Sequence, residues 1–106
     1  MGKRQEASWS PHAIGDLARL QDQIAVHDVA AAKYMTQVMD AVDRTEDHPE
    51  IGTRLESVPL EGEYRSIVVR NHRVVYRVRE GAIRVYRVWD CRQDPAGLWP
   101  SIREAD

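Results

Sequence analysis

Residues 63–94 constrain the fold of this 106-residue chain more than any other stretch. The stretch reads EYRSIVVRNHRVVYRVREGAIRVYRVWDCRQD, and its wealth of Val, Ile and Tyr is typical of β-structure. It holds eight of the fifteen basic residues, all arginine, against four acids, whereas the remaining residues carry seven bases against thirteen acids. The sequence therefore predicts a basic β-sheet inside a mildly acidic chain, which favours an anionic partner.

Three strands are predicted within this stretch, namely 64–70, 72–79 and 82–89. Asn71 is placed to tolerate the first turn, and Glu80-Gly81 makes the second. Alternation in the second strand directs one set of side chains to one face (Val74, Tyr76, Val78) and another set to the other face (Arg73, Val75, Arg77, Arg79).

The strand 82–89 is predicted to be apolar on both of its faces. Ile83, Val85 and Trp89 alternate against Tyr86 and Val88. Because both faces are apolar, we expect this strand in the interior of the sheet.

Two helices are predicted ahead of the sheet. Residues 5–9 are expected to form a short strand in which Trp9 is buried, and Ser10-Pro11 is a helix start, because Ser caps free amides and Pro suits the first helical position. Apolar residues then recur at helical spacing, with a shift of phase at which Asp28 is a plausible cap for a second helix. One helix over 11–44 also fits the pattern, but its 34 residues are unusual for so small a domain, so we prefer a helical hairpin.

Irregular segments are expected on both sides of the sheet. The second helix is predicted to end near Arg44, and a loop punctuated by proline and glycine follows over residues 45–52. Residues 55–60 are predicted as a short edge strand, since Pro59 keeps them away from the sheet centre. The tail from about residue 93 is expected to be irregular because prolines and glycine interrupt it.

The element order β-α-α-β-β-β predicts a single α+β domain over residues 1–106, with the helical pair packed on an antiparallel sheet of three to four strands. No apolar run approaches the roughly 20 residues of a membrane span, and we expect no contact with a membrane. The single cysteine, Cys91, and the absence of a secretory signal favour a reducing cytoplasm. The cysteine and the four histidines lack metal-ligand spacing, so we expect surface or capping histidines, no metal site and no cofactor.

An ordered set of motifs carries a resemblance to a known family. The motifs are Trp9-Ser10-Pro11-x-Ala13-x-x-Asp16-Leu17, Pro49-x-x-Gly52, Tyr64-Arg65, RNHRVVYRV (70–78), IRVYRV (83–88) and Arg92-Gln93-Asp94-Pro95. In this order they resemble the RelE/ParE family of bacterial toxins from type II toxin–antitoxin pairs, over about residues 8–98. The resemblance implies the same hairpin-on-sheet fold. It also implies a cognate antitoxin that folds on binding, and therefore a hetero-oligomer.

The family divides by target. RelE-like members are ribosome-dependent endoribonucleases that cut messenger RNA, whereas ParE-like members are associated with poisoning DNA gyrase. By position, Arg65 and Arg73 match two basic sites of RelE-like members and Arg92 approximates a third, so these three are the catalytic candidates if the chain is a ribonuclease. However, Ile67 stands where a further basic residue is expected, and no Tyr or His follows Arg92. Arginine is effectively never deprotonated and makes a poor base.

The missing acid–base pair favours gyrase poisoning over messenger RNA cleavage, and a binder over an enzyme. The ending WDCRQDP also resembles the ParE-like branch more closely. The alternatives are a RelE-like ribonuclease acting with the ribosome, and a non-catalytic nucleic-acid-binding module whose arginines contact phosphates. The residues predicted to contact the target are Arg65, Arg73, Arg77, Trp89 and Arg92, whereas the sequence does not identify which residues contact the antitoxin. For each arginine the alternative is simple solvent exposure, with ion pairs to neighbouring acids.

Overall fold

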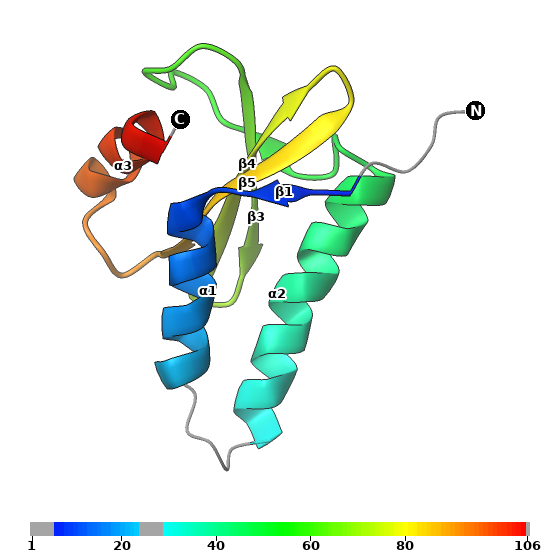
Figure 1. Cartoon of the computed structure of the whole chain (residues 1–106), viewed down its shortest axis with the longest axis vertical. Helices are drawn as coiled ribbons and strands as arrows, with labels where there is room; N and C mark the ends of the chain where they lie inside the picture. Colours follow the sequence, from blue (N-terminus) through cyan, green and yellow to red (C-terminus); the bar gives the residue numbers. More distant parts are fainter. Residues whose placement is uncertain (1–5, 24–28, 106) are drawn as a thin grey trace.

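A computed structural model describes residues 6–23 and 29–105 (Figure 1). In chain order the elements are β1 (Ser8–Trp9), α1 (Pro11–Gln23), α2 (Val29–Asp47), β2 (Thr53–Arg54), β3 (Glu63–Val69), β4 (His72–Arg79), β5 (Ala82–Asp90), the short 3-10 helix η1 (Pro95–Gly97) and α3 (Leu98–Ala105). The strands form one five-stranded sheet in the order β1-β5-β4-β3-β2. β1 is parallel to β5, and the other neighbours are antiparallel, as predicted.

The predicted helical pair is confirmed, and Ser10 begins α1. The Ser10 hydroxyl accepts the N–H of Ala13 at 3.1 Å and donates to the carbonyl of Tyr86 at 2.8 Å. It therefore caps the helix and also fastens it to β5. α2 continues three residues beyond the predicted end at Arg44, and Asp28 lies outside the described residues. Within the described ranges, no helix is long and apolar enough to cross a membrane.

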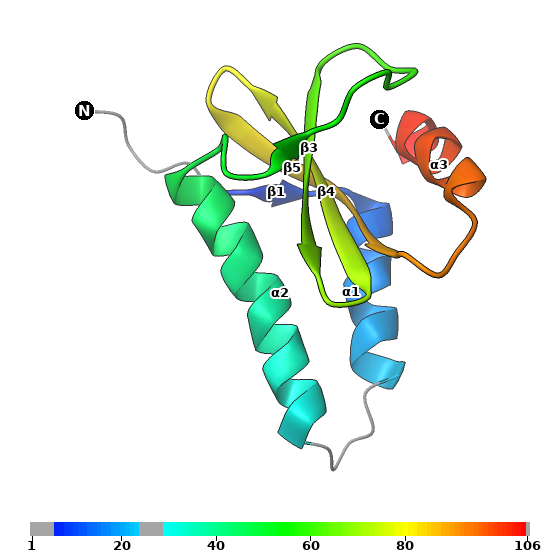
Figure 2. The same ribbon diagram turned by 180° about the vertical axis from the view of Figure 1, so that it is seen from behind.

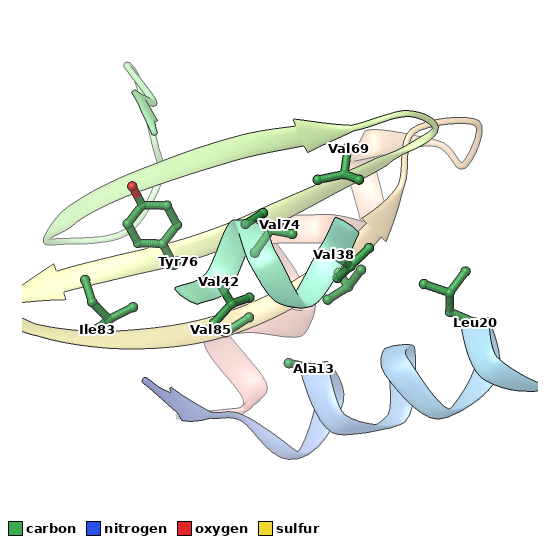
Figure 3. Packing of buried hydrophobic residues seen from close by; sticks show 11 residues of the cluster. Ala13, Leu20, Val38, Val42, Val69, Val74, Tyr76, Ile83 and Val85 are labelled. Atoms are coloured by element: carbon green, nitrogen blue, oxygen red, sulfur yellow. The ribbon is translucent and has the colours of Figure 1, made fainter. Parts of the chain in front are cut away.

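The main core lies between the two long helices and one face of the sheet, which we call the helix face (Figures 1 and 2). Figure 3 shows how side chains of both helices meet side chains of the sheet in this core. The buried members labelled there are Ala13, Leu20, Val38, Val42, Val69, Val74, Tyr76, Ile83 and Val85. Burying a side chain the size of valine or leucine stabilises the fold by roughly 1.5–3 kcal/mol.

The three long strands match the predicted ones to within one residue. However, a β-bulge in β5 changes which face of the sheet its side chains occupy. The register of β5 against β4 shifts by one residue at Tyr86. Side chains beyond the bulge therefore alternate in the opposite phase. The prediction that Trp89 shares a face with Ile83 and Val85 is wrong. Trp89 packs beside Tyr86 on the opposite face, and Val88 joins the helix-face core.

That opposite face, which we call the α3 face, carries a second core formed with the C-terminal segment. The prediction of an irregular tail is wrong, because η1 and α3 form within it. Asp94 caps η1 by accepting the N–H of Ala96 at 2.9 Å, and Leu98 and Ile102 form an apolar stripe on α3 at a spacing of four residues. Both side chains are buried in one cluster with Tyr64, Val75, Tyr86 and Trp89.

The predicted edge strand over residues 55–60 is also wrong. The edge strand is the two-residue β2, after which the chain leaves the sheet. Ser57, in the middle of the predicted strand, has a φ of 57°, and this left-handed conformation is incompatible with a regular strand. The apolar side chains of this loop instead cover part of the α3 face (Leu55, Val58, Leu60).

Both hairpin turns lie where the sequence predicts them. Glu80 and Gly81 have φ values of 53° and 80°, as a tight two-residue turn requires. In the first turn, however, Arg70 rather than Asn71 adopts the left-handed conformation, with a φ of 53°.

Candidate target-binding surface

The strand register divides the predicted site arginines between the two faces of the sheet. Residues directly opposite each other on neighbouring strands direct their side chains to the same face. Arg73 is opposite Trp89, and Arg77 follows Arg73 by four residues, so all three side chains belong to the α3 face. Arg65 is opposite Tyr76, whose ring lies in the helix-face core. Arg65 therefore lies on the other side of the sheet from Arg73.

Arg65 fastens the loop after α2 to β3. Its Nε donates to a carboxylate oxygen of Glu63 at 2.6 Å, and its Nη1 donates to the carbonyls of Gly52 at 2.8 Å and Glu50 at 3.2 Å. The hydrogen bond to Glu63 raises the pKa of Arg65 above its usual value, so the side chain stays charged. These contacts give Arg65 a structural role in the fold.

The Pro49-x-x-Gly52 motif forms a binding site for the hydroxyl group of Tyr76, next to Arg65. Tyr76 is fully buried, and its hydroxyl donates to the carbonyl of Pro49 at 2.8 Å and accepts the N–H of Gly52 at 2.9 Å. A Cβ on Gly52 would overlap this hydroxyl, so only glycine fits. Burial also raises the pKa of Tyr76 above its usual value, which keeps the phenol protonated.

Arg92 is exposed just after β5 and pairs with Asp90. Its Nη2 lies 2.8 Å from one carboxylate oxygen and its Nε 3.0 Å from the other. These bonds hold the pKa of Asp90 at about 2. Asp90 is opposite His72 in the register, so this ion pair belongs to the helix-face side and not to the face of Arg73.

His72 is buried, so the surface or capping role predicted for it is wrong. Its Nδ1 forms a hydrogen bond with the hydroxyl of Tyr34, which also accepts the N–H of Asn71 at 3.1 Å. Burial lowers the pKa of His72 below its usual value. The contact joins α2 to the β3–β4 turn. No group of three or more His, Cys, Asp or Glu in the described part of the chain is arranged to hold a metal ion.

A buried ion pair joins α1, β5 and α3. Arg87 donates from Nε and Nη2 to the two carboxylate oxygens of Asp16, at 2.7 and 2.6 Å, and from Nη1 to the hydroxyl of Ser101 at 2.7 Å. Asp16 also accepts the N–H of Val88 at 3.0 Å. The guanidinium carbon of Arg87 lies 4.9 Å from the centre of the Trp89 ring. Arg87 thus packs against the Trp89 ring and helps to position it.

Arg73 is the predicted site arginine with the fewest contacts of its own. It is half-buried, and no described residue forms a hydrogen bond or ion pair with its guanidinium group. It lines one hollow of about 240 Å³ with Trp89, Cys91, Gln93, Pro95 and Leu98. It also lines a second hollow of about 340 Å³, whose rim includes the exposed side chains of Ile51 and Val68. A cation flanked by exposed apolar groups suits a partner that offers both an anionic group and apolar contacts.

The chain matches the family described as the ParE toxin of the type II toxin–antitoxin system parDE, over residues 7–95. It belongs to the ParE toxin family. Among solved structures it is similar to one described as a chromosomal ParDE toxin–antitoxin system from P. aeruginosa, with 18% identity, a TM-score of 0.64, and coverage of 82% of this chain and 96% of the other. It is also similar to the YoeB dimer from Staphylococcus aureus, with 27% identity, a TM-score of 0.52, and coverage of 81% and 95%. No curated protein sequence matches.

Family membership confirms the RelE/ParE resemblance, and the ParE-like fold confirms the helical pair on an antiparallel sheet. In this ParE-family chain, three of the predicted contact residues share the α3 face (Arg73, Arg77, Trp89), while Arg65 and Arg92 do not. Their roles in target binding stay predictions. Sequence reasoning missed the pairing of Asp16 with Arg87. Its one signal is that both residues occur within the quoted family motifs.

Proposed function

We propose that this ParE-family chain inhibits bacterial growth by poisoning DNA gyrase, and that a cognate antitoxin neutralises it. The proposal rests on the separation of the three arginines that RNA cleavage would require together. Arg73 lies on the α3 face, Arg65 is fastened to a loop on the helix face, and Arg92 is paired with Asp90 after β5. A single phosphate has no access to all three side chains across the thickness of the sheet.

RNA cleavage by a 2′-hydroxyl also needs a group near the phosphate that accepts a proton. The described residues around the hollow beside Arg73 and Trp89 offer an indole, a thiol and an amide, but no imidazole, phenol or carboxylate. The imidazole of His72 is bonded to Tyr34 and lines a neighbouring hollow with Trp89 and Asp90, but it does not line the hollow beside Arg73. These placements support binding over catalysis.

We assign the gyrase contact to the α3 face around Arg73. Val68 is directly opposite Arg73 in the register and 57% exposed, so it provides apolar surface beside the guanidinium group of Arg73. Arg77 adds charge on the same face. Trp89 is 8% exposed, so we assign it a positioning role beneath Arg73 rather than a direct contact.

The antitoxin part of the proposal follows from the family, whose description names a type II toxin–antitoxin system. The test is co-expression in a bacterium. The chain alone is expected to stop growth, and the product of the neighbouring reading frame is expected to restore it. Normal growth with the chain alone would overturn the toxin function.

The target is tested with the purified chain. It is added to relaxed plasmid with gyrase and ATP and, in parallel, to a translating extract with a reporter messenger RNA. We expect supercoiling to be inhibited and the transcript to stay intact. Cleavage of ribosome-bound transcript with supercoiling unaffected would replace the proposal with a RelE-like ribonuclease.

A further inference from the structure

Arg73 is a half-buried arginine whose guanidinium group has no partner of opposite charge among the described residues. Three other arginines at or beside the sheet each form an ion pair within the chain, and they are Arg65 with Glu63, Arg87 with Asp16, and Arg92 with Asp90. Taking a charge partly out of water without a counter-charge costs free energy. A partner molecule that supplies an anion would offset this cost.

The two hollows beside Arg73 are lined by no other charged side chain of the described part of the chain. The lining of the smaller hollow includes the apolar groups of Trp89 and Leu98. The rim of the larger hollow includes the exposed side chains of Ile51 and Val68. Arg73 is thus a single cation between two largely apolar surfaces.

The strand register places these surfaces on opposite sides of Arg73. Val68 on β3 and Trp89 on β5 are both directly opposite Arg73 on β4, so the three side chains form a row across the α3 face. Neighbouring strands lie about 4.8 Å apart, so the row spans roughly 10 Å. A protein segment of only a few residues covers this distance.

We propose that this row binds an acidic side chain of a gyrase protein subunit, flanked on both sides by apolar side chains of the same segment. The carboxylate accepts hydrogen bonds from the guanidinium group of Arg73, and the flanking side chains contact Val68 and the hollow above Trp89. A carboxylate and a guanidinium group match at two points, which gives the contact its specificity. The inference rests on the proposed function, because it names the part of gyrase that the α3 face contacts.

The isolation of Arg73 favours a protein carboxylate over the DNA that gyrase handles. Affinity for duplex DNA comes largely from several cations that neutralise neighbouring phosphates. Arg77, the next arginine of this face along β4, is four residues from Arg73, or roughly 14 Å at the rise of an extended strand. Its guanidinium carbon lies 5.8 Å from the centre of the Tyr64 ring. One cation between apolar surfaces therefore matches a carboxylate better than a row of phosphates.

The test is the binding of the purified chain to purified gyrase subunits without DNA or ATP, measured by isothermal titration calorimetry. Binding to a duplex DNA fragment is measured in parallel. We expect saturable binding to gyrase protein alone. Because one charge pair is involved, raising the salt concentration from about 50 to about 200 mM should weaken this binding by about fourfold or less. Contacts with several phosphates would weaken it by on the order of a hundredfold or more.

Two variants connect the binding to the row of side chains. Arg73→Gln should weaken binding to gyrase protein by about tenfold or more, through loss of charge-assisted hydrogen bonds. Val68→Ser changes an exposed side chain beside Arg73 and should weaken the same binding by about threefold or more, through loss of apolar contact.

Each variant has a matched control. Arg79→Gln removes an exposed arginine from the same strand and the same face, six residues from Arg73. Val29→Ser replaces an exposed valine at the start of α2. Both controls should bind gyrase protein like the unchanged chain. Thermal melting of all four variants checks that each is folded.

Two results would overturn the inference. They are the absence of binding to gyrase protein without DNA, and unchanged affinity of Arg73→Gln or Val68→Ser for that protein. Supercoiling assays separate this failure from a failure of the proposed function. If the unchanged chain still inhibits supercoiling, the proposed function stands and the acidic contact alone is wrong. If it neither binds gyrase protein nor inhibits supercoiling, both are wrong.

Discussion

Asp16 and Arg87 form a buried two-point ion pair, with N–O distances of 2.6 and 2.7 Å. The exposed fractions of their side chains are 5% and 11%. The pair lies where α1, β5 and α3 meet, because Ser101 of α3 also binds Arg87. Asp16 of α1, near the N-terminus, therefore helps to hold the α3 face, which carries the proposed target contact.

Removing the carboxylate should destabilise the protein strongly. Asp16→Ala leaves Arg87 buried without its counter-charge, which typically costs about 3–5 kcal/mol of unfolding free energy. Urea denaturation followed by circular dichroism measures the change. Asp22→Ala, at an exposed acid of the same helix, should stay within about 0.5 kcal/mol of the unchanged protein. Equal effects of the two substitutions would contradict a supporting role for the ion pair.

Two glycine substitutions should change stability in opposite directions. Gly52→Ala forces a methyl group into the Tyr76 hydroxyl and should cost about 1–3 kcal/mol. Gly15→Ala lies within α1, where a Cβ makes only an ordinary contact with Arg19, and should stabilise by about 0.5–1 kcal/mol through helix propensity. Thermal melting of both variants gives the signs. A neutral Gly52→Ala would show that the Pro49-x-x-Gly52 motif has no steric basis.

The burial of His72 predicts a pH dependence of stability. Burial lowers its folded-state pKa, so below about pH 6.5 the unfolded chain binds a proton that the folded chain does not. Stability from this group is therefore full above about pH 6.5 and falls as the pH drops toward the folded-state pKa. His72→Gln should flatten this slope. Urea denaturation at about pH 7.5 and about pH 5.5 measures it, and equal slopes for both proteins would refute the assignment.

Arg65 and Arg73 should separate stability from activity. Arg65→Gln loses the bonds to Glu63 and Gly52, so it should lower the unfolding free energy by about 1–2 kcal/mol while the folded protein keeps its toxicity. Arg73→Gln breaks no bond to a described residue, so it should melt like the unchanged protein and yet lose toxicity. Growth curves together with melting temperatures decide the matter. The reverse pattern would move the proposed surface to the helix face.

Much of the fold follows from local pattern. Ser10-Pro11 begins a helix because of its capping chemistry, and Glu80-Gly81 turns because Gly81 readily accepts the positive φ that a tight turn requires. No local sequence pattern indicates the bulge at Tyr86. Simple alternation of side chains therefore assigns Trp89 to the wrong face of the sheet. α3 was missed because prolines and glycine suggest a loop. Yet Pro100 lies in the first turn of α3, where the missing N–H costs nothing.

The site was harder to predict than the fold. Arginines of similar sequence context lie on opposite faces of one sheet, and only the strand register separates Arg65 from Arg73. The buried contact between His72 and Tyr34 joins residues 38 positions apart. Such pairings depend on tertiary packing, which local sequence patterns do not predict.

The most direct test of the central claim is a dose–response curve of gyrase supercoiling for the unchanged chain and for Arg73→Gln, with transcript integrity recorded in a parallel translating extract. We predict inhibition by the unchanged chain, a shift of the half-inhibitory concentration by about tenfold or more for Arg73→Gln, and intact transcript throughout. Cleaved transcript together with undisturbed supercoiling would contradict the account.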